Sequence, residues 1–449
     1  MRLHYTKPLF AWDCLEDNPS LKTIKEFLQC IPDGKLLEAL AKERGKGRDD
    51  YRVHVLWGTL LLTIALRHVS IEACMADLRR NKDLRQLIGI ESADGVPKKW
   101  NMSRFLKTLG SQRCRRFLPE IFDAMVRRLG LVIPDCGQET CGDSSHLSAR
   151  AIRSKQDGHE KGLEQPTGGR KEYKDEEGKV TGVLEWFGYK LHLLVDKRHE
   201  VVLSYKVTTA NKADCEMVAE LIEQGKGNLP EGRIKTMAYD KAADGQEVHE
   251  ALKEAGIRPV IENRSLWREE KEKLLPGEDG QSNIVYDEAG TVYCYDKVSA
   301  QPVRHQMVYY GYEKKRGTLK YRCPAVCQGW RCPSQKLCNK DKPYGKTVRV
   351  KCEIDLRRFP PIPRATKEFE RLYKGRTAVE RVNARFKIFW GVDDGNITGA
   401  RRFHAYVGAV MIVHVAFATL LASAPRYEGT LGKTRLSAIA EALRQKGDT

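Results

Sequence analysis

The order of strands and helices expected between residues 136 and 265 leaves few folds open to this chain. The segments ETCGDSSHL, EWFGYKLHLLVD and VVLSYKVTTA have the composition of strands, and the turn DKRHE joins the last two as a hairpin. A helix is expected from about Asp214 to Gln224, followed by the strand RIKTMAYD, a helix near EVHEALKEAG and the strand RPVIEN. This order predicts an α/β core.

Two of the expected strands end in an acidic residue. The first ends in Asp143 and the fourth ends in Asp240. Taken alone, an aspartate at the end of a strand more often forms a turn or caps a helix than takes part in catalysis. A functional interpretation therefore needs a further group that acts with these two carboxylates.

The run YKGRTAVERVNARFK supplies a further carboxylate, Glu380, together with Tyr373, Arg376 and Lys387. On one helix, at about 100° per residue, their side chains fall within roughly 60° of each other. The apolar residues occupy the opposite side: Leu372, Val379, Val382, Phe386 and Phe389. One carboxylate among cationic and phenolic groups suits a phosphate-rich ligand with a metal ion. The alternative is an ordinary basic amphipathic helix, in which the glutamate only pairs with its neighbours.

The spacing Tyr-x2-Arg-x3-Glu-x6-Lys resembles the signature of bacterial insertion-sequence transposases of the DDE class, in which the glutamate is the third catalytic carboxylate. These enzymes have a ribonuclease H-like fold in which the strands of both aspartates are neighbours. The resemblance therefore implies that Asp143 and Asp240 meet, although they are 97 positions apart.

The same resemblance implies the chemistry. Asp143, Asp240 and Glu380 would be catalytic and would hold two Mg²⁺ or Mn²⁺ ions, which prefer oxygen ligands. The terminal phosphates of the element would bind the remaining signature residues, Tyr373, Arg376 and Lys387. The implied function is Mg²⁺-dependent cleavage at the terminal repeats by water, followed by strand transfer from the freed 3′-hydroxyl. The alternatives are a ribonuclease H-like nuclease without joining activity and a catalytically silent DNA-binding regulator.

The sequence after the second aspartate departs from the family. Many relatives carry an aromatic residue in a pattern like DKGYDS, whereas this chain has DKAADG, with Ala243 at that place. Base stacking there is therefore in doubt. Asp244 is interpreted either as a helix N-cap or as an additional ligand near the metal site.

Net charge favours nucleic acid as the partner. The 449 residues carry a formal net charge of +18, which favours a polyanionic partner. The resemblance implies that a homodimer binds double-stranded DNA at the element ends and the target. No membrane association is expected, because the only plausible spanning segment, Tyr406–Ala422, is short, carries His414 in its middle and is interpreted as a buried helix. Thirteen cysteines without a secretory segment indicate a reducing cytosol with mostly free thiols. The resemblance implies a bacterial cytoplasm, with the protein on the nucleoid.

The predicted architecture is a ribonuclease H-like α/β core that is interrupted by a β-rich insertion and preceded by an all-α domain. Its parts are a helical DNA-binding domain (1–130), the first part of the core (136–265), the insertion (266–362), the second part of the core (363–425) and a tail (426–449). Between residues 98 and 128 there are nine Lys or Arg and two acids, which fits either DNA binding or a solvated basic face. Residues 152–182 are charged and aperiodic and are predicted to be a loop beside Asp143.

The insertion is expected to contain two hairpins and a cysteine cluster. NIVYDEAGTVYCYD and MVYYGYEKKRGTLKYRCP alternate around turns, as hairpins do. Four cysteines follow within 16 residues: Cys323, Cys327, Cys332 and Cys338. Their close spacing favours structural Zn²⁺, although it is not a pair of C-x2-C hooks; an iron–sulfur cluster and free thiols remain the alternatives.

Overall fold

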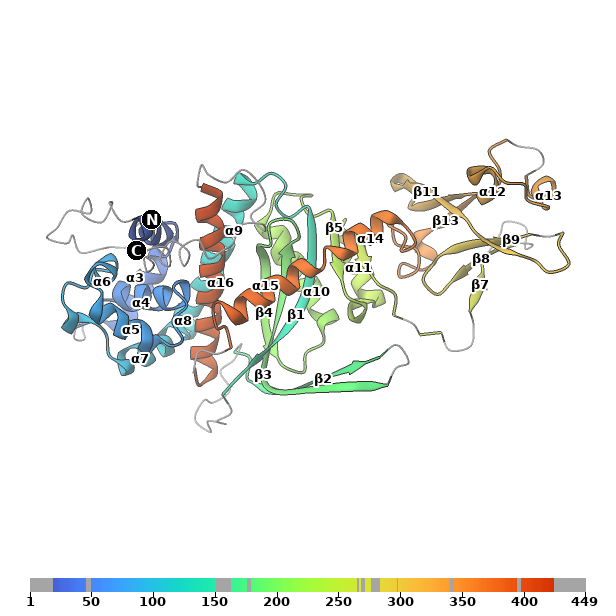
Figure 1. Cartoon of the computed structure of the whole chain (residues 1–449). Helices are drawn as coiled ribbons and strands as arrows, with labels where there is room; N and C mark the ends of the chain where they lie inside the picture. The colour runs from blue at the N-terminus through green and yellow to red at the C-terminus, as the bar shows by residue number, and fades with distance from the viewer. Residues whose placement is uncertain are drawn as a thin grey trace, which may run out of the picture.

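The computed structural model describes residues 19–45, 50–150, 163–175, 179–264, 266–267, 271–275, 283–296, 298–339, 343–393 and 397–423. The molecule is elongated, with helices at one end, a sheet in the middle and a β-rich part at the other end (Figure 1). The predicted tail 426–449 and residues 1–18 lie outside the described residues.

In its described residues between 19 and 132, the amino-terminal part contains helices joined by turns and no strand, as predicted. Its helices are α2 (Pro19–Gln29), α3 (Gly34–Arg44), α4 (Val53–Ala65), α5 (Ile71–Arg80), α6 (Lys82–Leu87), the 3₁₀ turn η1 (Ala93–Gly95), α7 (Lys99–Leu109), α8 (Gln112–Arg115) and α9 (Phe117–Val132). The apolar helix α4 is buried along most of its length, and its Trp57 donates a hydrogen bond of 2.8 Å to buried Asp33. Of the nine basic residues between 98 and 128, all but the half-buried Arg115 are exposed to solvent.

The central sheet is mixed and contains six strands in the order β2-β3-β1-β5-β6, with β4 also paired to β3. Their bounds are β1 (Glu139–Ser148), β2 (Thr167–Lys174), β3 (Val180–Asp196), β4 (Val202–Thr209), β5 (Thr236–Tyr239) and β6 (Arg258–Ile261). The pairs of β1 with β5 and of β5 with β6 are parallel, and the other pairs are antiparallel. The predicted β3–β4 hairpin and the order of the later elements are confirmed.

One prediction in this region is wrong. Part of the segment expected to be a loop, residues 152–182, forms strand β2, which pairs with the first half of β3 and extends this ribbon beyond the sheet (Figure 1). The strand could not be recognised from apolar alternation, because an exposed ribbon needs no apolar face and carries charged side chains such as Lys171. Residues 152–162 and 176–178 of that segment lie outside the described part of the chain.

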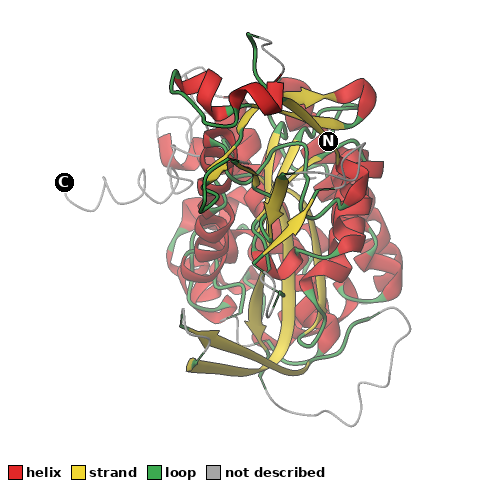
Figure 2. Ribbon diagram, turned by 90° about the vertical axis from the view of Figure 1, so that its right-hand side faces the viewer, coloured by secondary structure: helices red, strands yellow, loops and turns green. Residues whose placement is uncertain are grey.

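Helices cover both faces of the sheet (Figure 2). These are α10 (Asp214–Asn228), α11 (Gln246–Glu254), α14 (Lys367–Lys374) and α15 (Thr377–Ile388), with a 3₁₀ turn, η2 (Lys241–Ala243), after β5. Helix α16 (Ala400–Ser423) runs between the amino-terminal helices and the sheet (Figure 1). It is long and apolar enough to cross a membrane, but 89% of its most apolar stretch is buried inside the protein. The prediction of a buried helix is confirmed, and the backbone N–H of Val202 donates to its buried His414.

The inserted part between β6 and α14 is β-rich, and both predicted hairpins are present. Its elements are β7 (Glu272–Leu274), β8 (Ile284–Asp287), β9 (Val292–Tyr295), β10 (Arg304–Gln306), β11 (Val308–Glu313), η3 (Lys314–Arg316), β12 (Thr318–Arg322), α12 (Pro324–Gln328), α13 (Gln335–Asn339), β13 (Thr347–Lys351) and η4 (Cys352–Ile354). Four strands form one sheet and three form another. They enclose a small apolar core of their own, separate from the main one.

Candidate active site

Strands β1 and β5 bring the two candidate aspartates together. The parallel register pairs Glu139 with Thr236 and Cys141 with Ala238. Continuing this register by two residues places Asp143 beside Asp240, because the offset along both strands is constant. Neighbouring strands are about 4.8 Å apart, so the two carboxylates lie at one place in the sheet.

Strand β1 does not end at Asp143, as the sequence predicted, but continues to Ser148. The extension exists because β3 pairs with β1 as far as Ser148, whereas the parallel partner β5 ends at Tyr239. Asp143 therefore lies where β5 stops and leaves one edge of β1 open. The thiol of Cys141, two residues earlier, lies against Val379 of α15, and alternation places Asp143 on the same face.

The surroundings of Asp143 disfavour its negative charge. Burial raises the pKa of this half-buried carboxyl to about 6, although a hydrogen bond from the backbone N–H of Ser144 lowers it. The carboxylates of Asp240 and Asp214 raise it further, and the guanidinium of Arg376 opposes them. The site thus holds more negative charge than the protein itself neutralises, which is the condition for binding a cation.

Asp240 follows β5 directly and caps the turn η2. The backbone N–H of Ala242 donates to its Oδ1 at 2.9 Å. This bond fixes the carboxylate at the end of the strand, as predicted, and leaves it half-buried beside Asp143.

The signature residues lie on two helices, so the prediction of one continuous helix is wrong. Helix α14 ends at Lys374 and α15 begins at Thr377. Between them, the backbone N–H groups of Arg376, Ala378 and Val379 bond to carbonyls three residues back, and this tightens the turn. The side chain of Lys197 packs against the turn, where a Cβ on Gly375 would lie 1.8 Å from Lys197 Cε. A larger residue in place of Gly375 would therefore displace the end of the Lys197 side chain.

Three of the four signature residues meet at the break. Arg376 Nη2 lies 2.8 Å from Oε1 of Glu380, and its guanidinium lies 5.9 Å from the ring centre of Tyr373. Burial lowers the pKa of Arg376, but the charges of Glu380, Tyr373 and the two aspartates outweigh it and raise that pKa. Arg376 therefore acts as the internal counter-ion of all three candidate carboxylates.

Lys387 lies apart from this group, two turns farther along α15. Its Nζ is 3.1 Å from Nε2 of His146 and 3.7 Å from Asp393. Burial lowers the pKa of this ammonium, and Asp393 opposes the shift. Of the predicted apolar stripe, four residues are buried, whereas Phe389 is 37% exposed and lies under the guanidinium of Arg67.

The family model described as "Transposase DDE domain" matches residues 143–416 of this chain, starting at Asp143. The chain belongs to the transposase DDE domain family. A search of curated proteins finds no match. Among solved structures, the chain is similar to a piggyBac transposase synaptic complex with hairpin DNA, at 11% identity and a TM-score of 0.39, covering 98% of this chain and 84% of the other.

Enzymes of this family normally use divalent cations, which the candidate site would have to hold. Among the residues that the structure describes, no three His, Cys, Asp or Glu side chains are grouped closely enough to hold a metal ion. Glu380 is 49% exposed and turned to Arg376, which accounts for the missing third ligand. The pair Asp143 and Asp240 nevertheless fits Mg²⁺ or Mn²⁺, because two crowded carboxylates are the hard oxygen ligands that these ions prefer.

Two further acids near the site were missed by the sequence analysis. Glu262 follows β6 as Asp240 follows β5, and after burial its carboxylate is the main group that raises the pKa of Tyr373 to about 12. Asp214 begins α10 and pairs with Lys190 at 3.1 Å. Glu262 stands at the end of the predicted strand RPVIEN, and this position is the signal that could have identified it. Nothing in the sequence distinguishes Asp214 from an ordinary first residue of a helix.

Asp244 is not the N-cap of α11, because Gly245 occupies that position. Its buried carboxylate accepts hydrogen bonds from Arg357 Nη2 at 2.7 Å, from His249 Nε2 at 3.0 Å and from the backbone N–H of Arg264 at 2.9 Å. Burial would raise the pKa of Asp244, but these bonds hold it well below its usual range. With its oxygens so engaged, Asp244 ties the core to the chain that returns from the insertion.

Proposed function

We propose that this transposase belongs to a bacterial insertion sequence, binds the terminal repeats of its element, cuts the DNA there and joins the freed ends to target DNA. The observation that carries the proposal is that Asp143 and Asp240 lie on adjacent strands, with Arg376, the partner of Glu380, close enough to act on their charges. We also propose that the core is ribonuclease H-like, since its antiparallel strands β1, β3 and β4, with β2 added on β3, are followed by β5 and β6, which run parallel to β1, and helices lie on both faces.

Two Mg²⁺ or Mn²⁺ ions, when bound, would activate the attacking oxygen and stabilise the leaving oxygen of the phosphodiester. Asp143 and Asp240 would hold them from adjacent strands. Glu380 would complete the ligand set after leaving Arg376, and its exposure leaves it room to do so. The guanidinium thereby becomes available to a DNA phosphate, to which its planar fork can donate two hydrogen bonds.

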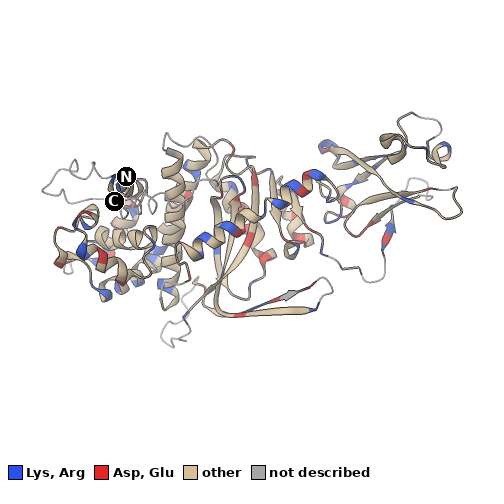
Figure 3. Cartoon of the chain, viewed as in Figure 1, with Lys and Arg blue, Asp and Glu red and all other residues tan. Residues whose placement is uncertain are grey.

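The other signature residues would hold the DNA end. Burial and Glu262 raise the pKa of Tyr373 to about 12, so its hydroxyl is protonated near neutral pH. It would leave its hydrogen bond with Glu262 to donate to a phosphate oxygen. Lys387 would contact the DNA farther along α15. Figure 3 shows Lys and Arg on the amino-terminal helices, on α15 and in the insertion, with acidic residues among them. We propose that basic residues of these parts contact double-stranded DNA along the length of the molecule and that a homodimer holds the element ends.

The deciding experiment compares two glutamates that each pair with a basic residue four positions away. Glu380→Gln should reduce Mg²⁺-dependent cleavage of the element's terminal DNA by a factor on the order of 10³, because a charged ligand is lost at the reacting phosphate. The control Glu370→Gln, on α14 and paired with Lys374 at 2.6 Å, should cut normally.

Equal cleavage by both glutamate variants would remove Glu380 from the site. Assays of the wild-type protein distinguish the transposase from the two alternative functions. Cutting without joining would identify a nuclease, and binding to the ends without any cutting would identify a DNA-binding regulator.

A second prediction concerns the phosphate contact. Arg376→Ala should weaken binding to terminal DNA and reduce the slope of log affinity against log salt by roughly 0.9, as expected for one lost phosphate contact. Lys374→Ala, an exposed cation that pairs with Glu370 instead of the site, should leave the slope unchanged. Binding titrations at several salt concentrations measure both, and an unchanged slope for Arg376→Ala would assign that residue to charge compensation alone.

A further inference from the structure

The segment between β12 and β13, residues 323–346, buries little apolar surface in the part that the structure describes. It carries the five-residue helices α12 and α13. Among its described residues, the buried ones are small or polar: Pro324, Ala325, Ser334 and Gly345. Leu337, by contrast, is 67% exposed. A segment of this length with so little buried apolar surface needs another source of stability.

Four cysteines converge on one cavity beneath this segment. Three come from the segment itself, Cys323, Cys332 and Cys338, and the fourth is Cys294 on the neighbouring strand β9. The free space in the cavity is about 30 Å³, enough for a single ion or water molecule. Cys327, which the sequence grouped with these thiols, is exposed on α12 and does not line the cavity.

The four sulfurs are within electrostatic reach of each other. Burial raises the pKa of the Cys294 thiol to about 12, and the next three groups that raise it are Cys323, Cys332 and Cys338. The thiols are free, and in this conformation they are not drawn together within bonding distance of one ion. All four side chains line the same small cavity, so an ion bound there is within reach of each of them.

We propose that Cys294, Cys323, Cys332 and Cys338 hold one structural Zn²⁺ ion, which fastens the α12–α13 segment to β9. Four thiolates at about 2.3 Å form a closed tetrahedral site of the structural type. Each thiol gives its proton to solvent as it binds, so four protons are released per ion. The resulting negative charge lies beside Lys346, whose Nζ is 3.1 Å from Asn283 Oδ1 at the cavity wall.

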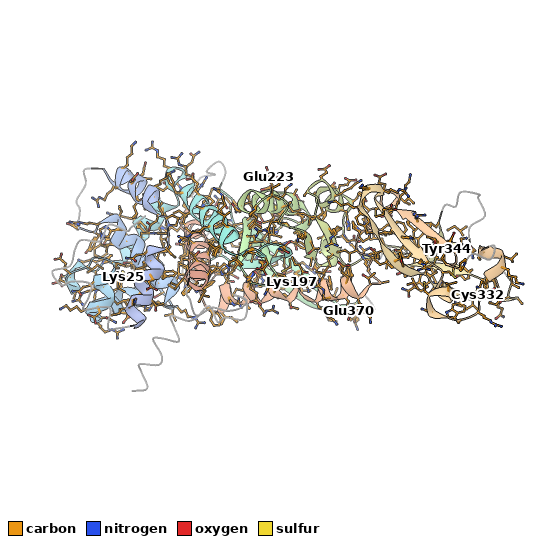
Figure 4. All side chains as sticks on the ribbon, turned by 90° about the horizontal axis from the view of Figure 1, so that it is seen from above. Lys25, Lys197, Glu223, Cys332, Tyr344 and Glu370 are labelled. Atoms are coloured by element: carbon orange, nitrogen blue, oxygen red, sulfur yellow. The ribbon has the colours of Figure 1, made fainter. Side chains whose placement is uncertain are left out.

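The site is independent of the proposed catalysis. Cys332 and Tyr344 mark one end of the molecule and Lys25 marks the other, with Lys197 and Glu370 between them (Figure 4). The metal is therefore tested by readouts other than DNA cleavage.

The first test uses the wild-type protein, which removes any question of folding. Protein purified without chelator should contain about one zinc per chain by elemental mass spectrometry. Brief alkylation followed by peptide mass spectrometry should label the exposed Cys215 and Cys327 at once. The four proposed ligands should be labelled only after a chelator has removed the metal. Fast labelling of Cys294 before chelation, iron in place of zinc, or disulfides among the four would overturn the proposal.

The second test compares two serine variants. Cys294→Ser should lose at least most of the bound zinc, and after cobalt substitution it should lack the absorption of a tetrahedral tetrathiolate site. Cys327→Ser should keep both. If Cys327→Ser lost the zinc and Cys294→Ser kept it, the ligands would be the four cysteines of residues 323–338, and the role of Cys294 would be refuted.

Discussion

Asp143→Asn should abolish cleavage and at the same time make the metal-free protein more stable at pH 8. In the folded chain, burial and the neighbouring carboxylates raise the pKa of Asp143 from 3.8 to about 6. The unfolded chain therefore releases this proton at lower pH than the folded chain does. As pH rises from about 4 to 6, wild-type stability falls, and above that window it stays lower by about 1–3 kcal/mol.

Asparagine carries no charge, so the variant avoids this loss. Its thermal midpoint in EDTA should exceed that of the wild type at pH 8, and the difference should vanish as pH falls to 4. Added Mg²⁺ should stabilise only the wild type, because binding to the folded state requires the carboxylate. Cleavage should fall by a factor on the order of 10³.

The control for this prediction lies on the same strand. Burial would raise the pKa of Glu139, but Arg371 and Lys197 outweigh it and lower that pKa. Glu139→Gln should therefore destabilise the protein at pH 8, the opposite sign. If Asp143→Asn also destabilised the metal-free protein at pH 8, its carboxylate would be a structural group rather than an unneutralised ligand.

The positions of the candidate residues could be predicted where local patterning determines them. The strand–helix order located Asp240 at the end of its strand, and the spacing of Arg376 and Glu380 on successive turns brought them together. The predicted end of the first strand failed because it depends on a distant part of the chain: the length of β1 is set by β3, so Asp143 lies inside a strand. The prediction of one continuous helix failed because the apolar spacing continues across the break between α14 and α15, so periodicity does not reveal the break.

The cysteine grouping also depends on a distant part of the chain. Four cysteines close in sequence suggested one cluster, but Cys327 on the short helix α12 is exposed to solvent. Cys294 lines the same cavity as Cys323, Cys332 and Cys338 although it lies far from them in the sequence, and a local pattern cannot reveal such a non-local contact. The domain boundaries predicted at 266 and 363 stay predictions, although each hairpin expected between them is present.

The largest loss of stability is expected from Asp244→Ala. The buried carboxylate is the partner of two arginines, Arg357 at 2.7 Å and Arg364 at 3.6 Å. Burial lowers the pKa of Arg364 to about 10 because it disfavours the charged guanidinium. The carboxylate of Asp244 stabilises that charge. Removing one partner of a buried ion pair costs about 3–5 kcal/mol, because the other charge stays buried without compensation.

A double-mutant cycle distinguishes this pairing from simple loss of packing. In an Arg357→Leu background, Asp244→Ala should cost at least about 1 kcal/mol less than it does in the wild type. Thermal unfolding measures the cycle, and additive losses would contradict the coupling.

The location of the network gives this loss a functional consequence. Arg357 and Arg364 lie between the last strand of the insertion and α14, and Arg364 also donates to the carbonyl of Ile261 at the end of β6 at 2.9 Å. Asp244 thus fixes the direction in which the chain enters the helices that carry Arg376 and Glu380. We therefore expect Asp244→Ala to lose cleavage well below its thermal midpoint, whereas Asp244→Asn, which keeps the shape and one acceptor, should retain part of it. Full cleavage by Asp244→Ala at low temperature would show that the insertion and the active site are positioned independently.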